Sequence, residues 1–272
     1  MKIGIFDSGY GGLTIWNRIQ QRLPQYDYIY LGDNARMPYG TRSFEVVYNY
    51  TLQCVQTLFD LGCQLVILAC NTASAKALRS IQQHDLPRIA PNRRVLGVIR
   101  PTVEAVDTLT KTNVVGLVAT EATIQSHSYL LELAKMCPDV KLVEQACPMW
   151  VPIIENNEHH SEGADFFVKK YLDRLFEQNQ LIDTLILGCT HYPLLIDKIR
   201  QYTPHHVAII EQGGIVADSL ADYLQRHPEI ESLCSKNGQT VFYTTENAEK
   251  FQQSASLFLQ RNITVKHLSI KE

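Results

Sequence analysis

The sequence predicts an α/β protein built from two related domains, each with a mainly parallel sheet. Short apolar runs alternate with longer segments of helical periodicity, which is typical of parallel sheets covered by helices. The run Val66–Thr72 resembles Leu185–His191, because each has an apolar stretch, a small residue, a cysteine and then polar residues. The run Lys2–Phe6 has a similar partner, Val114–Ala119, at nearly the same offset. These matched offsets indicate two pseudo-symmetric domains that face each other, with the active site in a cleft between them.

The individual elements follow from hydrophobic periodicity. Strands are predicted where short runs of Val, Ile, Leu and aromatic residues are bounded by turn or polar residues. In chain order these strands are Lys2–Phe6, Tyr28–Leu31, Gln64–Ala69, Arg94–Val98, Val114–Ala119, Leu142–Glu144, Thr184–Gly188, Val207–Glu211 and Val241–Tyr243. Helices are predicted where apolar residues recur three or four positions apart. The predicted helices are Gly12–Arg22, Ser43–Leu61, Ser74–Gln83, Pro101–Leu109, Ile124–Lys135, Gly163–Gln178 and Ile215–Gln225.

The first domain is expected to contain both ends of the chain. The strand at Val114 restarts the pattern of the N-terminus, and the strands after Val207 are too few to form a domain alone. We therefore expect a first α/β domain from residues 1–98 together with 210–272, and a second α/β domain from residues 99–209.

The overall charge gives no reason to expect a nucleic acid or an anionic membrane as a partner. The 25 basic and 28 acidic residues give a formal net charge of −3. No apolar stretch is long enough to span a bilayer, and Met1-Lys2 leads directly into the first predicted strand without a signal-peptide core. We therefore expect a cytoplasmic protein that acts on a small molecule and binds neither nucleic acid nor a membrane.

Two of the seven cysteines differ from the rest in their sequence context. The odd count and the lack of a Cys-x-x-Cys pair argue against a disulfide framework and a structural zinc site. Cys70 and Cys189, however, each lie between an apolar strand and a predicted helix start. Amides and the dipole at a helix start stabilise a thiolate relative to a thiol. A single cysteine of this kind is usually structural, but the same context in both halves predicts a pair of reactive thiols.

Paired thiols that approach one ligand from opposite faces suit the inversion of an amino-acid α-carbon. This reaction needs a base on one face and an acid on the other, and the two exchange roles when the direction reverses. The neighbouring residues then bind the charged groups of the substrate. Asn71, Thr72 and Thr190 can bind a carboxylate through side chains and helix-start amides. Asp7 can receive an ammonium group, and His191 can tune the second thiol or stabilise a carbanion.

The glycine-rich loop Asp7–Gly12 invites comparison with a dinucleotide-binding loop. It follows a predicted strand, opens a helix and precedes Asp33 by a suitable interval. The third glycine of that motif is replaced by Thr14, and an ionised Asp7 would repel a pyrophosphate. We therefore interpret the loop as a tight strand-to-helix turn and expect no nucleotide cofactor.

Two further polar segments are ambiguous from the residues alone. Asp33 and Asn34 end a predicted strand, and Tyr39 and Gly40 follow in a turn pattern that would hold a phenol and a backbone amide rigidly. A plain connecting loop is the simpler interpretation of this segment. Glu155 can equally be an ordinary solvated carboxylate.

Together these motifs resemble the glutamate racemases of the aspartate/glutamate racemase family. They appear in order along most of the chain as Phe6-Asp7-Ser8-Gly9 with Gly11-Gly12, Gly32-Asp33 with Pro38-Tyr39-Gly40, Ala69-Cys70-Asn71-Thr72-Ala73-Ser74, Ala146-Cys147-Pro148, and Leu187-Gly188-Cys189-Thr190-His191-Tyr192-Pro193. The resemblance implies a racemase that needs neither pyridoxal phosphate nor a metal and supplies D-glutamate for peptidoglycan synthesis. We also expect a homodimer.

The resemblance also implies roles for individual residues. Cys70 and Cys189 are the proton donors and acceptors, with Cys70 acting on the D-isomer and Cys189 on the L-isomer. The implied substrate contacts are Asp7, Ser8, Tyr39, Gly40, Asn71, Thr72, Thr190 and His191, with Asp7, His191 and Glu155 assisting catalysis. Two segments depart from the expected pattern: Arg100 stands where many relatives carry an acidic residue, and Glu211–Gly214 replaces a more usual Asp-Ser segment.

Three alternative functions remain open from the sequence. An aspartate racemase would share the fold and the thiol pair. A cysteine hydrolase would use Cys189 as nucleophile and His191 as base, but residues two apart after a strand rarely face each other, and Cys70 would be unexplained. A two-lobed metabolite-binding protein would explain the repeat but not the two thiols.

Overall fold

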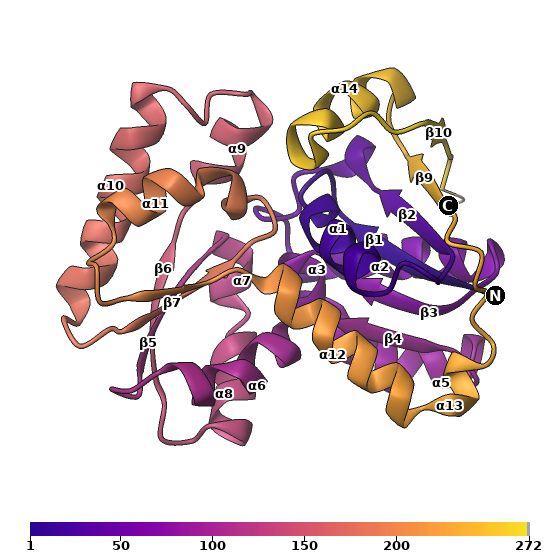
Figure 1. Cartoon of the computed structure of the whole chain (residues 1–272), viewed down its shortest axis with the longest axis horizontal. Helices are drawn as coiled ribbons and strands as arrows, with labels where there is room; N and C mark the ends of the chain where they lie inside the picture. Colours follow the sequence, from indigo (N-terminus) through magenta and orange to yellow (C-terminus); the bar gives the residue numbers. More distant parts are fainter. Residues whose placement is uncertain (271–272) are drawn as a thin grey trace.

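The computed structural model describes residues 1–270, in which two sheets are formed and every strand pairing is parallel (Figure 1). The first sheet has six strands in the order β10-β9-β2-β1-β3-β4, and the second has four in the order β6-β5-β7-β8. The predicted α/β class with two parallel sheets is confirmed. The strands are β1 Lys2–Asp7, β2 Tyr28–Gly32, β3 Cys63–Leu68, β4 Arg94–Gly97, β5 Val114–Ala119, β6 Lys141–Ala146, β7 Thr184–Gly188, β8 Ala208–Ile210, β9 Thr240–Thr244 and β10 Val265–His267.

Helices separate most of the strands, as parallel connections require. The longer α-helices are α1 Gly12–Arg22, α2 Phe44–Asp60, α6 Ile99–Leu109, α8 Ser128–Met136, α10 Glu162–Gln178, α12 Gln212–Arg226 and α14 Ala248–Leu259. The shorter helical segments are η1 Asn34–Arg36, α3 Asn71–Lys76, α4 Leu78–Ser80, η2 Ile81–Asp85, α5 Leu86–Ile89, α7 Glu121–Gln125, α9 Trp150–Glu155, η3 Tyr192–Leu195, α11 Ile196–Tyr202 and α13 Pro228–Glu231.

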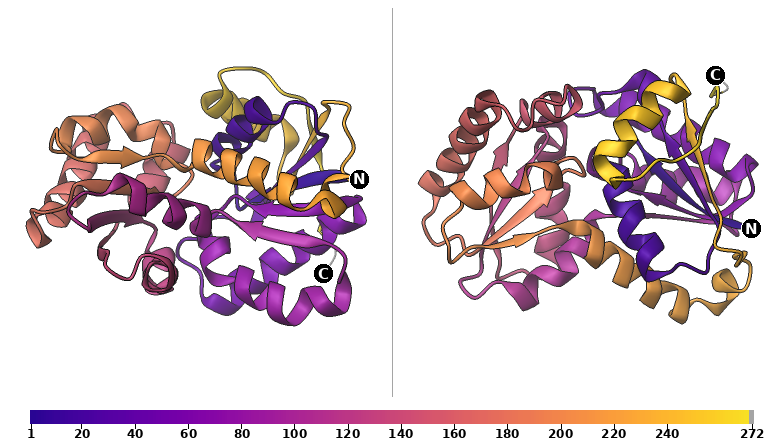
Figure 2. Two further views of the ribbon diagram at one scale, coloured as in Figure 1. Left: turned by 60° about the horizontal axis from the view of Figure 1, so that its bottom comes forward. Right: turned by 45° about the horizontal axis from the view of Figure 1, so that its top comes forward.

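The chain passes between the two sheets twice. It leaves the first sheet after β4 and enters the second through α6, and it returns after β8 through α12. The first sheet therefore combines strands from residues 2–97 with strands from residues 240–267. Figure 2 shows the yellow C-terminal segment lying beside the indigo N-terminal elements in both views.

The first sheet is buried on both faces because alternate residues of its strands face different helices. Ile3 and Ile5 of β1 belong to a core with α1, α12 and α14, whereas Phe6 belongs to a core with α2. Every residue of β3, β5 and β7 is buried as well. The apolar runs that predicted these strands are thus the interior of two helix-covered layers.

Two helices begin three residues earlier than predicted, at Asn71 instead of Ser74 and at Gln212 instead of Ile215. Cys70 caps the first of them, since its side chain accepts a hydrogen bond from the Ala73 N–H. In the second, Gly213 packs so closely on α1 that a Cβ atom would lie 2.7 Å from Arg18 Cγ. A glycine that the sequence pattern assigns to a loop is therefore a helix–helix contact.

The elements α14 and β10 were not predicted. The helix α14 is rich in polar residues, and its position depends on Phe251, which is fully buried and packs against Tyr10 and Tyr30. This packing joins residues far apart in the chain, so local periodicity does not reveal it.

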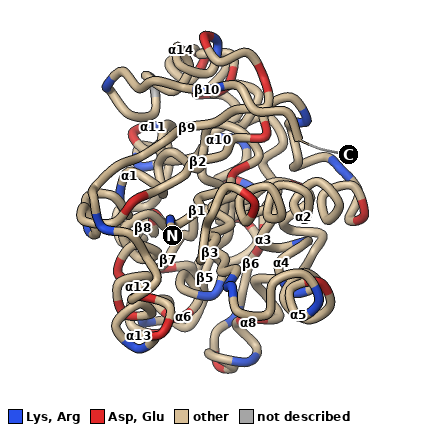
Figure 3. The backbone as a smooth tube through the Cα atoms, turned by 90° about the vertical axis from the view of Figure 1, so that its right-hand side faces the viewer, with Lys and Arg blue, Asp and Glu red and all other residues tan. Residues whose placement is uncertain are grey.

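Charged residues of both signs are interspersed along the chain (Figure 3). Several exposed pairs lie one helical turn apart, such as Arg100–Glu104 and Lys169–Asp173, and such pairs contribute little to stability. Within residues 1–270, no helix combines the length and the apolarity that crossing a bilayer demands.

A buried carboxylate, Asp27, joins the start of β2 to the segment that leads into β9. It is 4% exposed and accepts hydrogen bonds from the Asn237 N–H (3.1 Å), the Asn237 side-chain amide (2.7 Å) and the Gln239 N–H (2.9 Å). Burial alone would raise the pKa of Asp27, but hydrogen bonds from Gln239, Ser235 and Asn237 lower it to about 2. The ionised carboxylate therefore ties the N-terminal and C-terminal parts of the first sheet together.

Asp27→Ala is expected to lower the free energy of unfolding by about 2 kcal/mol at pH 7, because buried N–H groups lose a charged acceptor. The folded-state pKa lies below the value of about 3.9 for an unfolded aspartate, so the stabilisation is complete above that value. It is lost as the pH falls towards 2. Urea titrations at pH 7 and pH 3 measure the effect, with the exposed Asp139→Ala as the matched control. Equal stability of the two variants at pH 7 would contradict this role of Asp27.

Candidate active site

The two cysteines singled out by the sequence follow equivalent strands of the two sheets. Cys70 comes after β3, the neighbour of β1, and Cys189 comes after β7, the neighbour of β5. Both side chains are buried, at 6% and 7% exposure. A negative charge on Cys189 would add to the effects that raise the pKa of Cys70, of which burial is the largest. We call Asp7, Ser8, Cys70, Cys189, His191 and Glu155 the two-thiol site.

Cys70 is surrounded by neutral hydrogen-bonding groups and one carboxyl group. Its Sγ lies 3.4 Å from Ser8 Oγ and accepts a hydrogen bond of 3.5 Å from the Ala73 N–H. Burial, and then the nearby charge of Asp7, raise the pKa of Cys70 to about 12 despite these contacts. Cys70 is therefore a thiol at neutral pH and a proton donor in this state.

Asp7 is completely buried at the end of β1, and one of its oxygens has no partner. Its Oδ2 accepts a hydrogen bond from the Gly9 N–H at 2.9 Å, while Oδ1 is without a hydrogen-bond partner. Burial raises the pKa of Asp7, although His191 and the amides of Gly9 and Gly12 oppose the rise. An unpartnered buried oxygen is costly, so Oδ1 is a ready acceptor for a donor such as an ammonium group.

Cys189, His191 and Glu155 form a continuous contact. Cys189 Sγ lies 3.8 Å from His191 Nδ1, and His191 Nε2 lies 3.0 Å from Glu155 Oε1. Burial disfavours the imidazolium, but the contacts with Cys189 and Glu155 outweigh it and raise the pKa of His191 well above its usual value. The expectation that residues two apart after a strand do not face each other was wrong here. The backbone turns into a helical conformation at His191, which brings its ring back over the sulfur.

The glycine loop after β1 packs directly on the Cys189 segment. A Cβ atom at Gly11 would lie 2.3 Å from Thr190 Oγ1 and 2.4 Å from His191 Nδ1. Thr14 Oγ1 donates a hydrogen bond of 3.1 Å to the Thr190 carbonyl. The edge of Phe258, on α14, approaches the His191 ring with centroids 5.7 Å apart. The loop therefore needs glycine for contact between the domains, which is a reason independent of any nucleotide.

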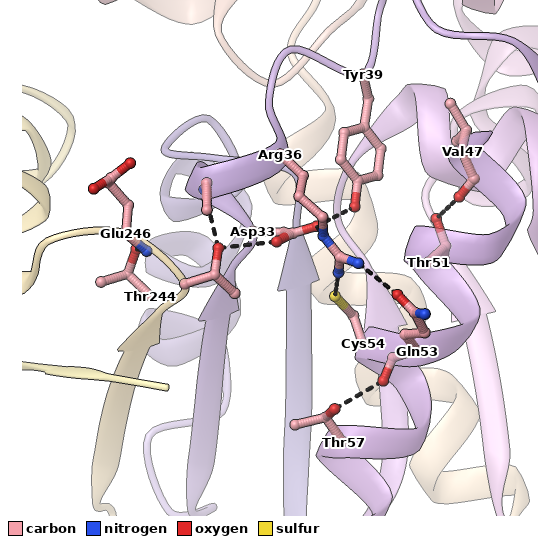
Figure 4. Close-up of polar contacts among 12 residues, drawn as sticks. Asp33, Arg36, Tyr39, Val47, Thr51, Gln53, Cys54, Thr57, Thr244 and Glu246 are labelled. Atoms are coloured by element: carbon pink, nitrogen blue, oxygen red, sulfur yellow. Dashed lines mark hydrogen bonds and ion pairs between the residues drawn. The ribbon is translucent and has the colours of Figure 1, made fainter. Parts of the chain in front are cut away.

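The loop carrying Tyr39 and Gly40 is held by a buried polar cluster (Figure 4). The Tyr39 hydroxyl donates to Asp33 Oδ2, and the same carboxylate pairs with Arg36 Nε at 2.7 Å. Arg36 Nη2 also lies 3.3 Å from Cys54 Sγ. The Tyr39 hydroxyl is thus occupied by its hydrogen bond to Asp33, which supports the loop. The backbone of Tyr39 and Gly40 is the part that can face a ligand.

The side chains of Asn71 and Thr72 are also committed to protein partners. Thr72 Oγ1 lies 3.0 Å from Thr120 Oγ1 and 3.3 Å from Thr123 Oγ1. Asn71 Nδ2 donates to Gln212 Oε1 at 2.6 Å. The N–H groups of Asn71 and Thr72, however, belong to the first turn of α3, where no intrahelical acceptor exists. These amides, rather than the side chains, are the better anion donors.

Sequence reasoning missed Arg36, Thr120 and Gln212. Thr120 directly follows β5, the counterpart of β1, so the internal repeat would have indicated it as the equivalent of Ser8. Gln212 has no such signal because its partner Asn71 is distant in the chain, and Arg36 lies beside Asp33 in a segment that the sequence alone describes most simply as a connecting loop.

The arrangement combines two buried sulfur groups from opposite domains, an unpaired carboxylate oxygen and a histidine that favours its charged form. These groups can take a proton from one side of a carbon atom and return one to the other side. Within the described part of the chain, no three His, Cys, Asp or Glu side chains gather as a possible metal site.

Comparison with known proteins gives a consistent family. The model of the Asp/Glu/Hydantoin racemase family matches residues 14–220. The glutamate racemase of Roseobacter denitrificans is 41% identical, over 97% of this chain and 98% of the relative. The structure of glutamate racemase isoform RacE1 from Bacillus anthracis has a TM-score of 0.90 at 34% identity, covering 99% of this chain and 97% of that chain. The structure of the Francisella tularensis glutamate racemase in complex with D-glutamate has a TM-score of 0.87 at 34% identity, with the same coverage. The chain therefore belongs to the Asp/Glu/Hydantoin racemase family, and within it to the glutamate racemases.

Proposed function

We propose that this chain interconverts L- and D-glutamate without a cofactor, using Cys70 and Cys189 as the two proton-transfer groups. The observation that carries the proposal is that both buried thiols follow equivalent strands of opposite domains and have different proton partners. The Francisella relative was solved with D-glutamate, which supports glutamate as the substrate.

The binding groups follow from the unpaired polar atoms of the site. Asp7 Oδ1 lacks a partner and can accept a hydrogen bond from the substrate ammonium group. The first-turn amides after Cys70 and the equivalent segment at Thr190 can hold a carboxylate. The Tyr39–Gly40 backbone, fixed through Asp33, lines the same region because the Gly40 carbonyl accepts a hydrogen bond from the Ala122 N–H at 3.0 Å.

Proton transfer then proceeds in two steps. In the direction from L to D, a thiolate at Cys189 removes the α-proton, and the electron pair remains on Cα and is delocalised into the carboxylate. The Cys70 thiol gives its proton to the opposite face of Cα, so that Cys189 ends as the thiol and Cys70 as the thiolate. The charged His191 stabilises the Cys189 thiolate, and Glu155 holds the ring in place. The reverse reaction uses the same groups with their roles exchanged.

The biological role and the setting are also part of the proposal. D-glutamate is a component of peptidoglycan, so we propose that the enzyme supplies this precursor as a homodimer in the cytoplasm. The reaction as proposed uses a small-molecule substrate and no second macromolecule.

Dialysed enzyme in deuterated buffer is expected to exchange the α-proton of both L- and D-glutamate and to bring either one to a racemic mixture. Added pyridoxal phosphate or a chelator should leave the rate unchanged, because the thiol pair suffices. Aspartate should react more slowly by roughly tenfold or more, since its missing methylene group weakens contacts in the transition state. NMR and circular dichroism measure exchange and racemisation. Faster turnover of aspartate would instead establish the aspartate racemase alternative.

Cys70→Ser and Cys189→Ser should each reduce racemisation by roughly 10²–10⁴-fold, because a serine hydroxyl is too weak an acid to replace a thiolate. Each variant keeps one base and should still eliminate a β-leaving group from only one enantiomer of a glutamate analogue. By the family resemblance, Cys189→Ser retains elimination from the D-analogue and Cys70→Ser from the L-analogue. The buried Cys137→Ser, whose hydroxyl can still donate to the Val103 carbonyl, is the matched control. Near wild-type racemisation by either site variant would rule out the two-thiol mechanism.

Glu155→Gln is expected to lower the pKa of His191, because the imidazolium loses the carboxylate at 3.0 Å. The protonated ring supports the Cys189 thiolate, so the alkaline limb of the kcat/KM profile should move to lower pH by about one unit. The exposed Glu158→Gln serves as the control, since it makes a similar change on the same segment. An unchanged alkaline limb in Glu155→Gln would exclude this role of the ion pair.

A further inference from the structure

Three buried side chains form a closed ring of hydrogen bonds beside Cys70. Asn71 Nδ2 donates to Gln212 Oε1 at 2.6 Å, and Gln212 Nε2 donates to the Tyr129 hydroxyl at 2.8 Å. The Tyr129 hydroxyl in turn donates to Asn71 Oδ1 at 2.7 Å, which closes the ring. The three residues are 2%, 3% and 1% exposed, in the order Asn71, Gln212 and Tyr129.

Gln212 also makes a branch from the ring. Its Nε2 donates to Thr102 Oγ1 at 2.8 Å, and the Thr102 hydroxyl donates to the Val98 carbonyl at 2.7 Å. Both hydrogens and the oxygen of the Gln212 amide are thereby used. Burial raises the pKa of Tyr129, so its phenol keeps the proton that it donates to Asn71. With water excluded, such a network strongly favours one geometry over alternatives that leave a polar atom unpaired.

The ring lies where the chain passes between the two sheets. Gln212 is the first residue of α12 and Thr102 lies in α6, and these helices carry the two crossings (Figure 1). Tyr129 comes from α8 of the second domain. Asn71 is the first residue of α3 and directly follows Cys70. A single amide side chain thus connects both crossings and the second domain to the residue next to a proton-transfer thiol.

The ring also fixes the orientation of the Asn71 amide. A primary amide could be turned by 180° with little change in shape, but only one orientation lets Asn71 accept from Tyr129 and donate to Gln212. One hydrogen of Nδ2 is left uncommitted on a side chain that can no longer turn.

We propose that Gln212 is a positioning residue for racemisation. Its hydrogen bonds hold Asn71, and with it the Cys70 side of the site, in a fixed position relative to the second domain. This inference rests on the proposed two-thiol function. Racemisation requires both thiols to be aligned on opposite faces of Cα during one encounter, whereas removal and return of a proton on one face requires only one thiol. Loss of the ring should therefore impair inversion more than exchange.

Gln212→Met tests the proposal because it keeps the side-chain length and removes all the hydrogen bonds of the amide. Tyr129→Phe opens the ring but leaves Gln212 in place, and Thr102→Val removes only the branch and is the matched control. For the first two variants, kcat for racemisation should fall on the order of tenfold to a hundredfold, as expected for misplacement of about 1 Å. The ratio of deuterium exchange with retention to exchange with inversion should rise about tenfold by the same reasoning. Thr102→Val should leave this ratio unchanged.

The ratio separates positioning from simple loss of folded enzyme, because unfolding lowers exchange and inversion equally. If Gln212→Met does not fold, Tyr129→Phe provides the same comparison, because it removes a single hydroxyl group and still opens the ring. An unchanged ratio in the ring variants, or an equal rise in Thr102→Val, would overturn the proposal. Wild-type enzyme measured first gives the proposed function its own test: if it neither exchanges nor racemises glutamate, that function fails irrespective of any variant.

Discussion

Burial of polar groups between the two domains is the constraint on which the chemistry of this protein depends. In water, the Asp7 carboxyl group and both thiols would have ordinary pKa values, and neither thiol would differ from the other. In the folded chain, burial raises the pKa of Asp7 and raises that of Cys70 to about 12. The pKa of His191 is raised as well, but for an imidazole this favours the charged form, because the contacts with Cys189 and Glu155 outweigh its desolvation. The surroundings of each group, rather than its residue type, therefore decide which groups are protonated in the free protein and which lie beside a positive charge.

The two halves are alike in backbone but not in the partners of their thiols. Cys70 and Cys189 follow equivalent strands, yet Cys70 meets a serine hydroxyl and a backbone amide, whereas Cys189 meets an imidazole. In the proposed mechanism, an unsymmetrical pair of thiols thus serves a reaction that runs in both directions. The free protein is arranged with a protonated Cys70, so the proton returned to the carbanion is already in place on that side. In the proposed binding mode, an ammonium group next to Asp7 would offset the charge of Asp7, which adds to burial in raising the pKa of Cys70. This change would make the Cys70 thiolate accessible once substrate is bound.

Much of the fold could be predicted from the sequence because apolar runs and their spacing report burial within single elements. The repeat of the two cysteine segments likewise revealed that both strands end at comparable places. The hydrogen-bond partners of individual polar atoms could not be predicted. Tyr39 bonds to Asp33, and Asn71 bonds to Gln212, which is distant in the chain. The first pair depends on the path of the loop after β2, and the second on how distant segments meet. The local sequence pattern of these residues encodes neither. The sequence also argued against Cys189 and His191 as a nucleophile–base pair, because residues two apart after a strand rarely face each other.

Each thiol segment is held in place by contacts with the opposite domain as well as by its own sheet. After Cys70, the side chain of Thr72 contacts Thr120 and Thr123 of the second domain. After Cys189, the Thr190 carbonyl accepts a hydrogen bond from Thr14 of the first domain. A relative movement of the domains must therefore disturb both thiol segments at once, and neither sulfur can shift alone without breaking buried contacts. The proposed mechanism needs near-contact distances to Cα on both faces, and these contacts between the domains would hold the two sulfur atoms in alignment. Gly11 belongs to the same arrangement, because a Cβ atom there would displace the side chains of Thr190 and His191.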